Sequence, residues 1–215
     1  MRYDLVIFDF DGTLADSFPF FVSVQNKLAQ RHGFRAIPNE DIDGLRHLPA
    51  RELMRHVGLP RWKLPFVARG FIRHMREEGG NVRLFPGVAP ALDRLHASGA
   101  TLALVTSNAA DNCRRVLGET HYARIAHVEC GASILGKQRR IRRTLAATGF
   151  PAGNAIYVGD QAEDAMAARA AGVAFAAVSW GYATPAALQA HAPDVVLDRV
   201  DAIGDLRHAA SGFRD

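Results

Sequence analysis

The stretch Val6-Ile7-Phe8-Asp9-Phe10-Asp11-Gly12-Thr13-Leu14-Ala15-Asp16 decides the fold of this 215-residue chain. An apolar run ends at Asp9, a second carboxylate follows at Asp11, and Gly12-Thr13 turns the backbone. A carboxylate at the end of a buried strand is costly without compensation, and carboxylates two residues apart on an extended segment point to one side and repel each other. A divalent cation is the simplest compensation. The stretch therefore predicts a metal site and phosphate chemistry.

The composition indicates a globular protein with no membrane partner. Hydrophobic residues make up 48% of the chain and charged residues 22%, which is ordinary for this class. No apolar run approaches the roughly 20 residues of a membrane-spanning helix, and no apolar leader precedes the first strand. Cys113 and Cys130 lack metal-ligand spacing. We therefore expect a cytoplasmic protein with reduced cysteines.

The basic residues are concentrated in one segment. Residues 17–84 contain 12 Lys/Arg and 6 Asp/Glu, whereas the rest of the chain contains 14 and 16. Basic residues are not interleaved with aromatic ones in the way that base-stacking surfaces need, so no nucleic-acid partner is expected. The excess of positive charge instead suggests an acidic or phosphorylated small molecule. The sequence leaves monomer and homodimer open.

Apolar strands and helical stretches alternate outside that segment, which predicts an α/β fold with a parallel, Rossmann-like sheet. The expected strands are 4–8, 101–106, 126–129, 155–159, 173–178 and 194–197, and the expected helices are 88–98, 111–117, 137–148, 163–171 and 200–209. Residues 17–84 contain no convincing strand. Helices ending near Gly33, at 50–57 before Gly58, and from 64 to about 77–80 predict a small all-helical insert. The predicted domains are therefore a core of 1–16 and 85–215 and a helical cap of 17–84.

Polar residues follow four of the predicted strands, where a parallel sheet binds its ligands. They are Asp9 and Asp11, Thr106-Ser107-Asn108, Lys137, and Asp160 with Asp164. Each also has a plainer interpretation, since a strand-ending threonine, a lysine in the first turn of a helix and an aspartate at a helix start are common structural features. Their joint position on one edge of the sheet favours a shared site.

Phosphoryl transfer through an aspartyl-phosphate uses all of these groups. Asp9, Asp160 and the backbone carbonyl of Asp11 are predicted to hold Mg²⁺, and Asp11 is predicted to act as general acid and base. Thr106 and Lys137 would bind the phosphate oxygens. Backbone N–H groups near Gly12 and Thr13 would help to hold the phosphate, with Ser107 and Asn108 as further substrate-binding residues.

These motifs resemble the haloacid dehalogenase-like hydrolase superfamily over nearly the whole chain. The resemblance lies in Asp9-x-Asp11-Gly12-Thr13, in the apolar strand ending at Thr106, in Gly136-Lys137, and in Gly159-Asp160-x-x-x-Asp164. Phe85-Pro86-Gly87-Val88 is similar to the phosphoglycolate phosphatase-like branch. The resemblance implies Mg²⁺ dependence, a helical cap, Asp9 as nucleophile and metal ligand, Asp11 as acid/base, Asp160 as metal ligand, and Asp164 as a residue that binds the metal or orients its shell.

Two departures narrow the reaction that this resemblance implies. Dehalogenases of the family lack the second aspartate, so Asp11 disfavours carbon–halogen cleavage. Many phosphoglycolate phosphatases and sugar phosphomutases carry a lysine just after the second motif, whereas Ala109 and Ala110 follow Asn108 here. The leading prediction is a phosphatase acting on a small phosphorylated metabolite. The alternatives are a sugar phosphomutase of the same family and a non-catalytic regulatory member.

Two further sequence features bear on the function. Gly131 to Lys137 fits the phosphate-binding pattern Gly-x-x-x-x-Gly-Lys, but Gln138 stands where that site needs Ser or Thr, which argues against nucleotide hydrolysis. In the cap, Arg46 and His47 lie in a loop where caps of this family place specificity residues. We expect them to face the leaving group, against the plainer interpretation that they are solvated surface residues.

Overall fold

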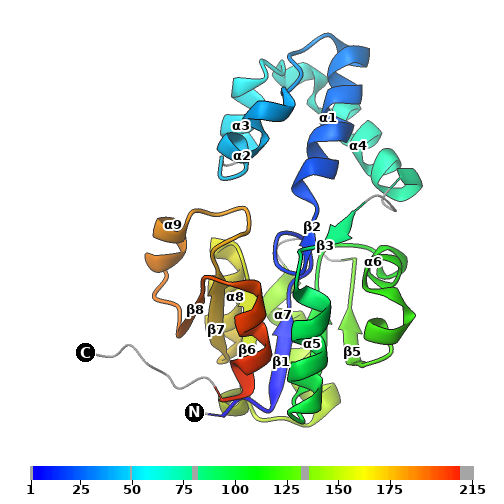
Figure 1. Ribbon diagram of the computed structural model, residues 1–215. Helices are drawn as coiled ribbons and strands as arrows, with labels where there is room; N and C mark the ends of the chain where they lie inside the picture. Colours follow the sequence, from blue (N-terminus) through cyan, green and yellow to red (C-terminus); the bar gives the residue numbers. More distant parts are fainter. Residues whose placement is uncertain (1, 49, 79–81, 132–135, 209–215) are drawn as a thin grey trace. The chain divides into compact units, whose positions relative to one another are not determined.

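The computed structural model describes residues 2–48, 50–78, 82–131 and 136–208 (Figure 1). The chain divides into two compact units, one formed by Met1–Asp16 with Leu84–Asp215 and the other by Ser17–Arg83. Across the described ranges, no helix combines the length and the apolar character that a membrane crossing would need.

The first unit is built on a six-stranded, wholly parallel sheet, which confirms the predicted α/β class. The strand order is β5-β4-β1-β6-β7-β8. The strands are β1 (Leu5–Phe8), β4 (Thr101–Val105), β5 (Ile125–Glu129), β6 (Ala155–Gly159), β7 (Ala174–Val178) and β8 (Val195–Leu197).

Strand β1 lies inside the sheet, and its composition explains why. All four of its residues are fully buried, and they pair with β4 on one side and with β6 on the other, so that Phe8 stands opposite Leu104 and Val158. A continuous apolar run is what a strand covered on both faces requires. The edge strand β8 differs, since its Val196 is 47% exposed.

Helices follow the strands in the βαβ manner that parallel pairing needs. They are α5 (Val88–Ala97), α6 (Ala110–Tyr122), α7 (Lys137–Thr148), α8 (Ala162–Ala171) and α9 (Pro185–Gln189), with 3₁₀ turns at Ala152–Asn154 and Val200–His208. Helices α7 and α8 pack against each other and bury Ile141 and Ala168 against Leu5 and Ile7 of β1. Figure 1 shows α5 in front of the sheet, where it packs against the 3₁₀ helix Val200–His208.

The second unit is helical. It contains α1 (Phe18–His32), α2 (Ile42–Leu45), α3 (Ala50–His56) and α4 (Leu64–Glu78), with 3₁₀ turns at Asn39–Asp41 and Arg61–Lys63. Helices α1 and α4 pack together through the rings of Phe21 and Phe71, whose centroids are 5.0 Å apart, and Gly70 leaves room for the Leu28 side chain. Helix α1 ends, as predicted, at Gly33, which adopts the left-handed conformation with φ 66°.

Several local expectations differ from the structure. The helical segment expected at 200–209 is present over Val200–His208, where it has the 3₁₀ form. The segment 17–84 was expected to contain no strand, but Arg83–Leu84 forms the short strand β3, which pairs with β2 (Ala15–Asp16). The helix expected at 111–117 extends over Ala110–Tyr122 and is interrupted at Gly118, where φ is 74°. The expected end of the last cap helix includes Gly79 and Gly80, which lie outside the described residues.

Because β1 is buried between two strands and two layers of helices, it should tolerate truncation poorly. We expect Ile7→Ala to lower the free energy of unfolding by about 2–5 kcal/mol, through lost burial and the cavity that remains. Val196→Ala on the half-exposed edge strand is the matched control and should cost less than about 1 kcal/mol. Urea unfolding followed by circular dichroism measures both, and equal losses would contradict this account of the core.

Candidate active site

The order of the strands places the site next to β1. From β1 the chain builds β4 and β5 on one side of the sheet, and it then returns to build β6, β7 and β8 on the other. Parallel sheets bind ligands at such a reversal, beyond the carboxyl ends of the strands. Asp9, Thr106 and Asp160 are the first residues after β1, β4 and β6, so the register brings them to the same edge.

Three carboxylates converge at this edge. Asp9, Asp160 and Asp164 each offer an oxygen within 4.8 Å of the others, and their exposed fractions are 5%, 0% and 0%. Lys137, the first residue of α7, donates from Nζ to Asp9 Oδ2 at 2.8 Å and to Asp164 Oδ1 at 2.5 Å. Four predicted site residues are therefore brought together, and one ammonium group faces three carboxylates.

The charges in this cluster influence one another strongly. Burial, with the Asp164 and Asp9 carboxylates, raises the pKa of Asp160 well above its usual value. Burial and the Asp9 carboxylate raise the pKa of Asp164 to about 6. Although burial opposes its charge, the carboxylates of Asp9 and Asp164 raise the pKa of Lys137. Asp160 and Asp164 therefore resist ionisation, and a cation bound between the carboxylates would favour their ionised forms.

The donor set fits a divalent cation. Three carboxylates carry more charge than one lysine neutralises, and carboxylate oxygens are the ligands that hard cations such as Mg²⁺ prefer. The Asp11 carboxylate is not a member of this group. The predicted contact of its backbone carbonyl with a metal stays a prediction.

The Asp160 side chain packs directly against the backbone of Gly12 and Gly181, where a side chain on either glycine would not fit. Thr13 Oγ1 donates to its Oδ1 at 3.2 Å, and the Tyr182 N–H donates to its Oδ2 at 2.7 Å. A Cβ atom on Gly12 would lie 2.3 Å from Asp160 Oδ2, and one on Gly181 would lie 2.1 Å from Asp160 Cβ. Both glycines are therefore required for the close approach of these two loops.

The loop after β7 supports the turn after β1. Trp180 Nε1 donates to the carbonyl oxygen of Thr13 at 3.1 Å, and its ring meets the Phe85 ring edge-on at 6.4 Å between centroids. The signal in the sequence is Trp180-Gly181-Tyr182, a glycine between two aromatic residues shortly after β7.

Asp164 also shapes the start of α8. Its Oδ2 accepts the N–H groups of Asp160 and Gln161 at 3.2 and 3.0 Å, and Gln161 completes a capping box with it. Because Oδ1 of the same carboxylate accepts from Lys137, Asp164 joins the helix start to the acidic cluster.

Asp11 is held separately from the acidic cluster. Asn108 Nδ2 donates to both of its carboxylate oxygens, at 2.9 and 3.2 Å. The Asn108 N–H donates to Thr106 Oγ1 at 3.0 Å, and Thr106 is buried. Asn108, predicted as a substrate-binding residue, thus contacts the predicted acid–base residue.

The other predicted substrate-binding groups are distributed differently. The N–H groups of Gly12 and Thr13 donate within their own turn, to the carbonyls of Ala15 and Phe10, rather than pointing to an open phosphate site. Ser107 is exposed at the end of β4.

Arg46 and His47 lie in the second unit, directly after α2. The Arg46 guanidinium stands 5.3 Å from the centroid of the Phe18 ring, a cation–π contact within that unit. Their predicted contact with a substrate stays a prediction. Residues 132–135 of the phosphate-binding pattern lie outside the described residues.

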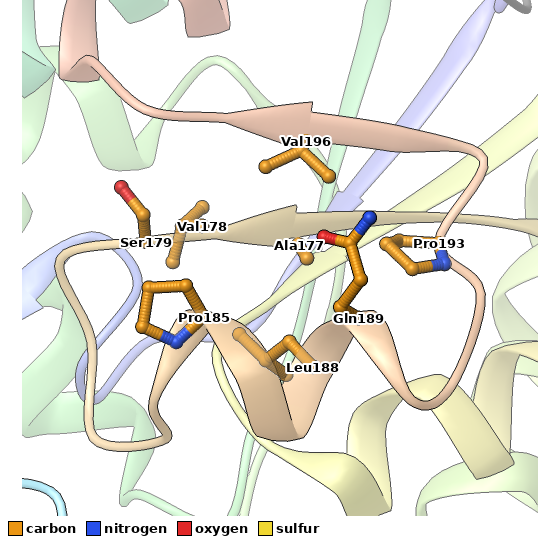
Figure 2. Close-up of a pocket in the computed structure, with 8 residues that line it drawn as sticks. All are labelled: Ala177, Val178, Ser179, Pro185, Leu188, Gln189, Pro193 and Val196. Atoms are coloured by element: carbon orange, nitrogen blue, oxygen red, sulfur yellow. The ribbon is translucent and has the colours of Figure 1, made fainter. Parts of the chain in front are cut away.

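A separate hollow lies between α9 and the strands β7 and β8. Its lining is mostly apolar, and none of the predicted site residues contributes to it (Figure 2): Ala177, Val178, Ser179, Pro185, Leu188, Gln189, Pro193 and Val196. It offers no titratable side chain for catalysis. The acidic cluster is therefore the better candidate for the chemistry.

Comparisons with known proteins agree with this geometry. A profile of the haloacid dehalogenase-like hydrolase family matches residues 6–178. The phosphoglycolate phosphatase of Synechococcus elongatus is 33% identical over 194 residues, covering 90% of this chain and 92% of that protein. The phosphoglycolate phosphatase of Agrobacterium fabrum is 33% identical, with 90% and 88% covered. A haloacid dehalogenase-like hydrolase structure from Streptococcus pneumoniae superposes with a TM-score of 0.78 at 19% identity, covering 92% of this chain and 95% of that one.

The crowding of carboxylates predicts an unusual effect on stability. Without divalent cations, Asp160→Asn should raise the Tm, because burial and the neighbouring carboxylates raise the pKa of Asp160, so that folding at neutral pH carries the cost of suppressing its ionisation, whereas the amide does not ionise and can serve both Thr13 Oγ1 and the Tyr182 N–H. The gain should be roughly 2–4 °C for each kcal/mol of relieved repulsion. Added MgCl₂ should raise the Tm of the native protein and have little effect on Asp160→Asn.

Asp205→Asn is the control, because the Asp205 side chain is 80% exposed. It should leave both the Tm and its response to MgCl₂ unchanged. An Asp160→Asn protein that is less stable without metal, together with a native protein indifferent to MgCl₂, would contradict a cation site here.

Proposed function

The chain belongs to the haloacid dehalogenase-like hydrolases and is a phosphatase, and we propose that it hydrolyses a small phosphomonoester by way of a phosphorylated Asp9. The observation that carries this proposal is the buried cluster of Asp9, Asp160 and Asp164 around Lys137. Such a cluster is expensive to bury, and the binding of a cation and a phosphate would make use of it.

Asp9, Asp160 and Asp164 would hold Mg²⁺, which supplies the positive charge that lets an anionic nucleophile meet an anionic substrate. Lys137 Nζ, 2.8 Å from Asp9, would contact the phosphoryl oxygens after transfer. Thr106 would offer its hydroxyl to the same group. Because Asp9 is buried and the Lys137 side chain is only 14% exposed, these interactions would be partly shielded from water.

In the first step, a carboxylate oxygen of Asp9 forms a bond to phosphorus, and the bond from phosphorus to the leaving oxygen breaks. The electron pair stays on the leaving oxygen, which takes a proton from the Asp11 carboxyl group. In the second step, Asp11 takes a proton from water while the water oxygen attacks phosphorus. The electron pair of the broken bond returns to Asp9, and Asp11 is again protonated.

The substrate that we propose is phosphoglycolate or a similar small alkyl phosphate. The support is that two relatives covering about nine-tenths of the chain are named for that activity.

The free thiols of Cys113 and Cys130, 4.0 Å apart, fit a reducing cytoplasm. The Ser17–Arg83 unit stays the predicted cap, with Arg46 and His47 as its predicted substrate-binding residues.

The nucleophile assignment predicts a severe effect at one position. Asp9→Asn should lower kcat for p-nitrophenyl phosphate at least roughly 1,000-fold, because an amide oxygen is a poor nucleophile. Chelation of divalent cations should abolish turnover by the native protein, and MgCl₂ should restore it. Asp205→Asn is again the control and should keep native kinetics. An Asp9→Asn enzyme as active as the native one would remove this mechanism.

The proposed substrate class is tested with a panel of phosphorylated metabolites. Among small alkyl phosphates, phosphoglycolate should give the highest kcat/KM, measured by the release of inorganic phosphate. A preference for a sugar phosphate, with an isomer and no free phosphate as product, would instead show the mutase reaction. Equal rates on the whole panel would contradict a dedicated phosphoglycolate activity.

A further inference from the structure

Helix α6 begins with a buried amide for which the proposed reaction has no role so far. Asn112 is 8% exposed, although its neighbours Asp111 and Arg114 are exposed. Its Nδ2 donates to Asn108 Oδ1 at 3.1 Å, one helical turn earlier in the chain. Buried side-chain amides are nearly always hydrogen-bonded, and the bond that Asn112 makes is to the predicted site residue Asn108.

The contact determines which way the Asn108 amide faces. Asn108 Oδ1 accepts from two donors, the Ala109 N–H at 2.8 Å and Asn112 Nδ2. The Ala109 N–H can only donate, so the oxygen of the Asn108 amide faces it and the NH₂ group faces away, and Asn112 Nδ2 adds a second donor to the same oxygen. On that opposite side, Asn108 Nδ2 donates to both oxygens of Asp11.

The backbone of Asn108 is anchored independently. Its N–H donates to Thr106 Oγ1 at 3.0 Å, and its carbonyl accepts the Gly131 N–H at 2.8 Å. These bonds place the residue but leave its side-chain torsions unconstrained. The side chain is constrained by Ala109 and Asn112, and of these only Asn112 acts through a side chain that mutation can remove.

We propose that Asn112 is a positioning residue for catalysis, which acts through Asn108 to hold the Asp11 carboxyl group against the leaving oxygen of the substrate. This inference rests on the proposed function, in which Asp11 delivers a proton to that oxygen as the bond to phosphorus breaks. A wrongly turned Asn108 would present its oxygen to the Asp11 carboxylate, and repulsion would displace the acid.

The proposal makes a distinction that a purely structural role would not make. An alkoxide leaving group needs the proton of Asp11, whereas p-nitrophenolate is stable enough to leave without it. Loss of Asn112 should therefore lower kcat/KM for alkyl phosphates and spare p-nitrophenyl phosphate. General destabilisation of the protein would lower both values alike.

The test compares Asn112→Leu, which keeps the shape of the side chain but has no donor, with the native enzyme on two substrates. We expect kcat/KM for phosphoglycolate to fall about tenfold and that for p-nitrophenyl phosphate to change less than about twofold. Asn112→Gln retains an amide donor and should recover part of the loss. Arg115→Ala, at an exposed position of the same helix, should match the native enzyme on both substrates.

A double-mutant cycle tests whether Asn112 acts through Asn108. Asn108→Leu should likewise lower kcat/KM for phosphoglycolate and spare p-nitrophenyl phosphate. Adding Asn112→Leu to it should cause no further fall in kcat/KM. Additive losses, or equal losses on both substrates, would overturn the proposal. If Asn112→Leu does not fold, Asn112→Gln is compared with Asn112→Ser. Glutamine should keep a higher kcat/KM for phosphoglycolate, relative to that for p-nitrophenyl phosphate, than serine, because the shorter serine side chain does not reach Asn108. Equal ratios for the two variants would overturn the proposal.

These results separate the two proposals. A native enzyme that hydrolyses neither substrate would refute the proposed function, and this inference with it. A native enzyme that hydrolyses both, with Asn112→Leu unaffected on the alkyl phosphate, would refute the inference alone.

Discussion

The site depends on the compensation of three buried carboxylates by one ammonium group. Lys137 bonds to Asp9 and Asp164 at once, so it holds the end of β1 against the start of α8. One ammonium group does not compensate all three carboxyl groups, since burial and two acidic neighbours raise the pKa of Asp160 and make it harder to ionise. A protein that accepts this cost has a site prepared for positive charge, and a phosphatase needs such a site to bring two anions together.

The surrounding loops make this compensation possible by their close approach. Gly12 and Gly181 leave space for the Asp160 side chain. The Trp180 indole N–H donates to the Thr13 carbonyl oxygen and so holds the turn in place. The sheet that carries these loops also supports the acidic cluster. Tyr157, fully buried in β6, donates its hydroxyl to the Val105 carbonyl at 2.9 Å, and its ring lies 5.8 Å from Lys137 Nζ. The acidic cluster is therefore supported from strand, turn and loop together.

The fold and the central site could be predicted because their signals are local. The continuous apolar run of β1 announces a buried parallel strand, and Asp9, Thr106 and Asp160 each follow such a strand directly, so strand order alone brings them together. The contact of Asn108 with Asp11 joins residues 97 apart, and that of Trp180 with Thr13 joins residues 167 apart. Neither has a periodic pattern or a motif spacing in the sequence. The 3₁₀ form of Val200–His208 was missed because its apolar spacing also suits an α-helix.

Asp9 and Asp11 have different surroundings, and this difference explains how one motif can supply two functions. Asp9 accepts a hydrogen bond from the Lys137 ammonium group and belongs to the buried acidic cluster with Asp160 and Asp164. Asp11, two residues on, accepts hydrogen bonds from the neutral amide of Asn108 and is not a member of that cluster. Carboxylates placed in unlike environments can take unlike roles.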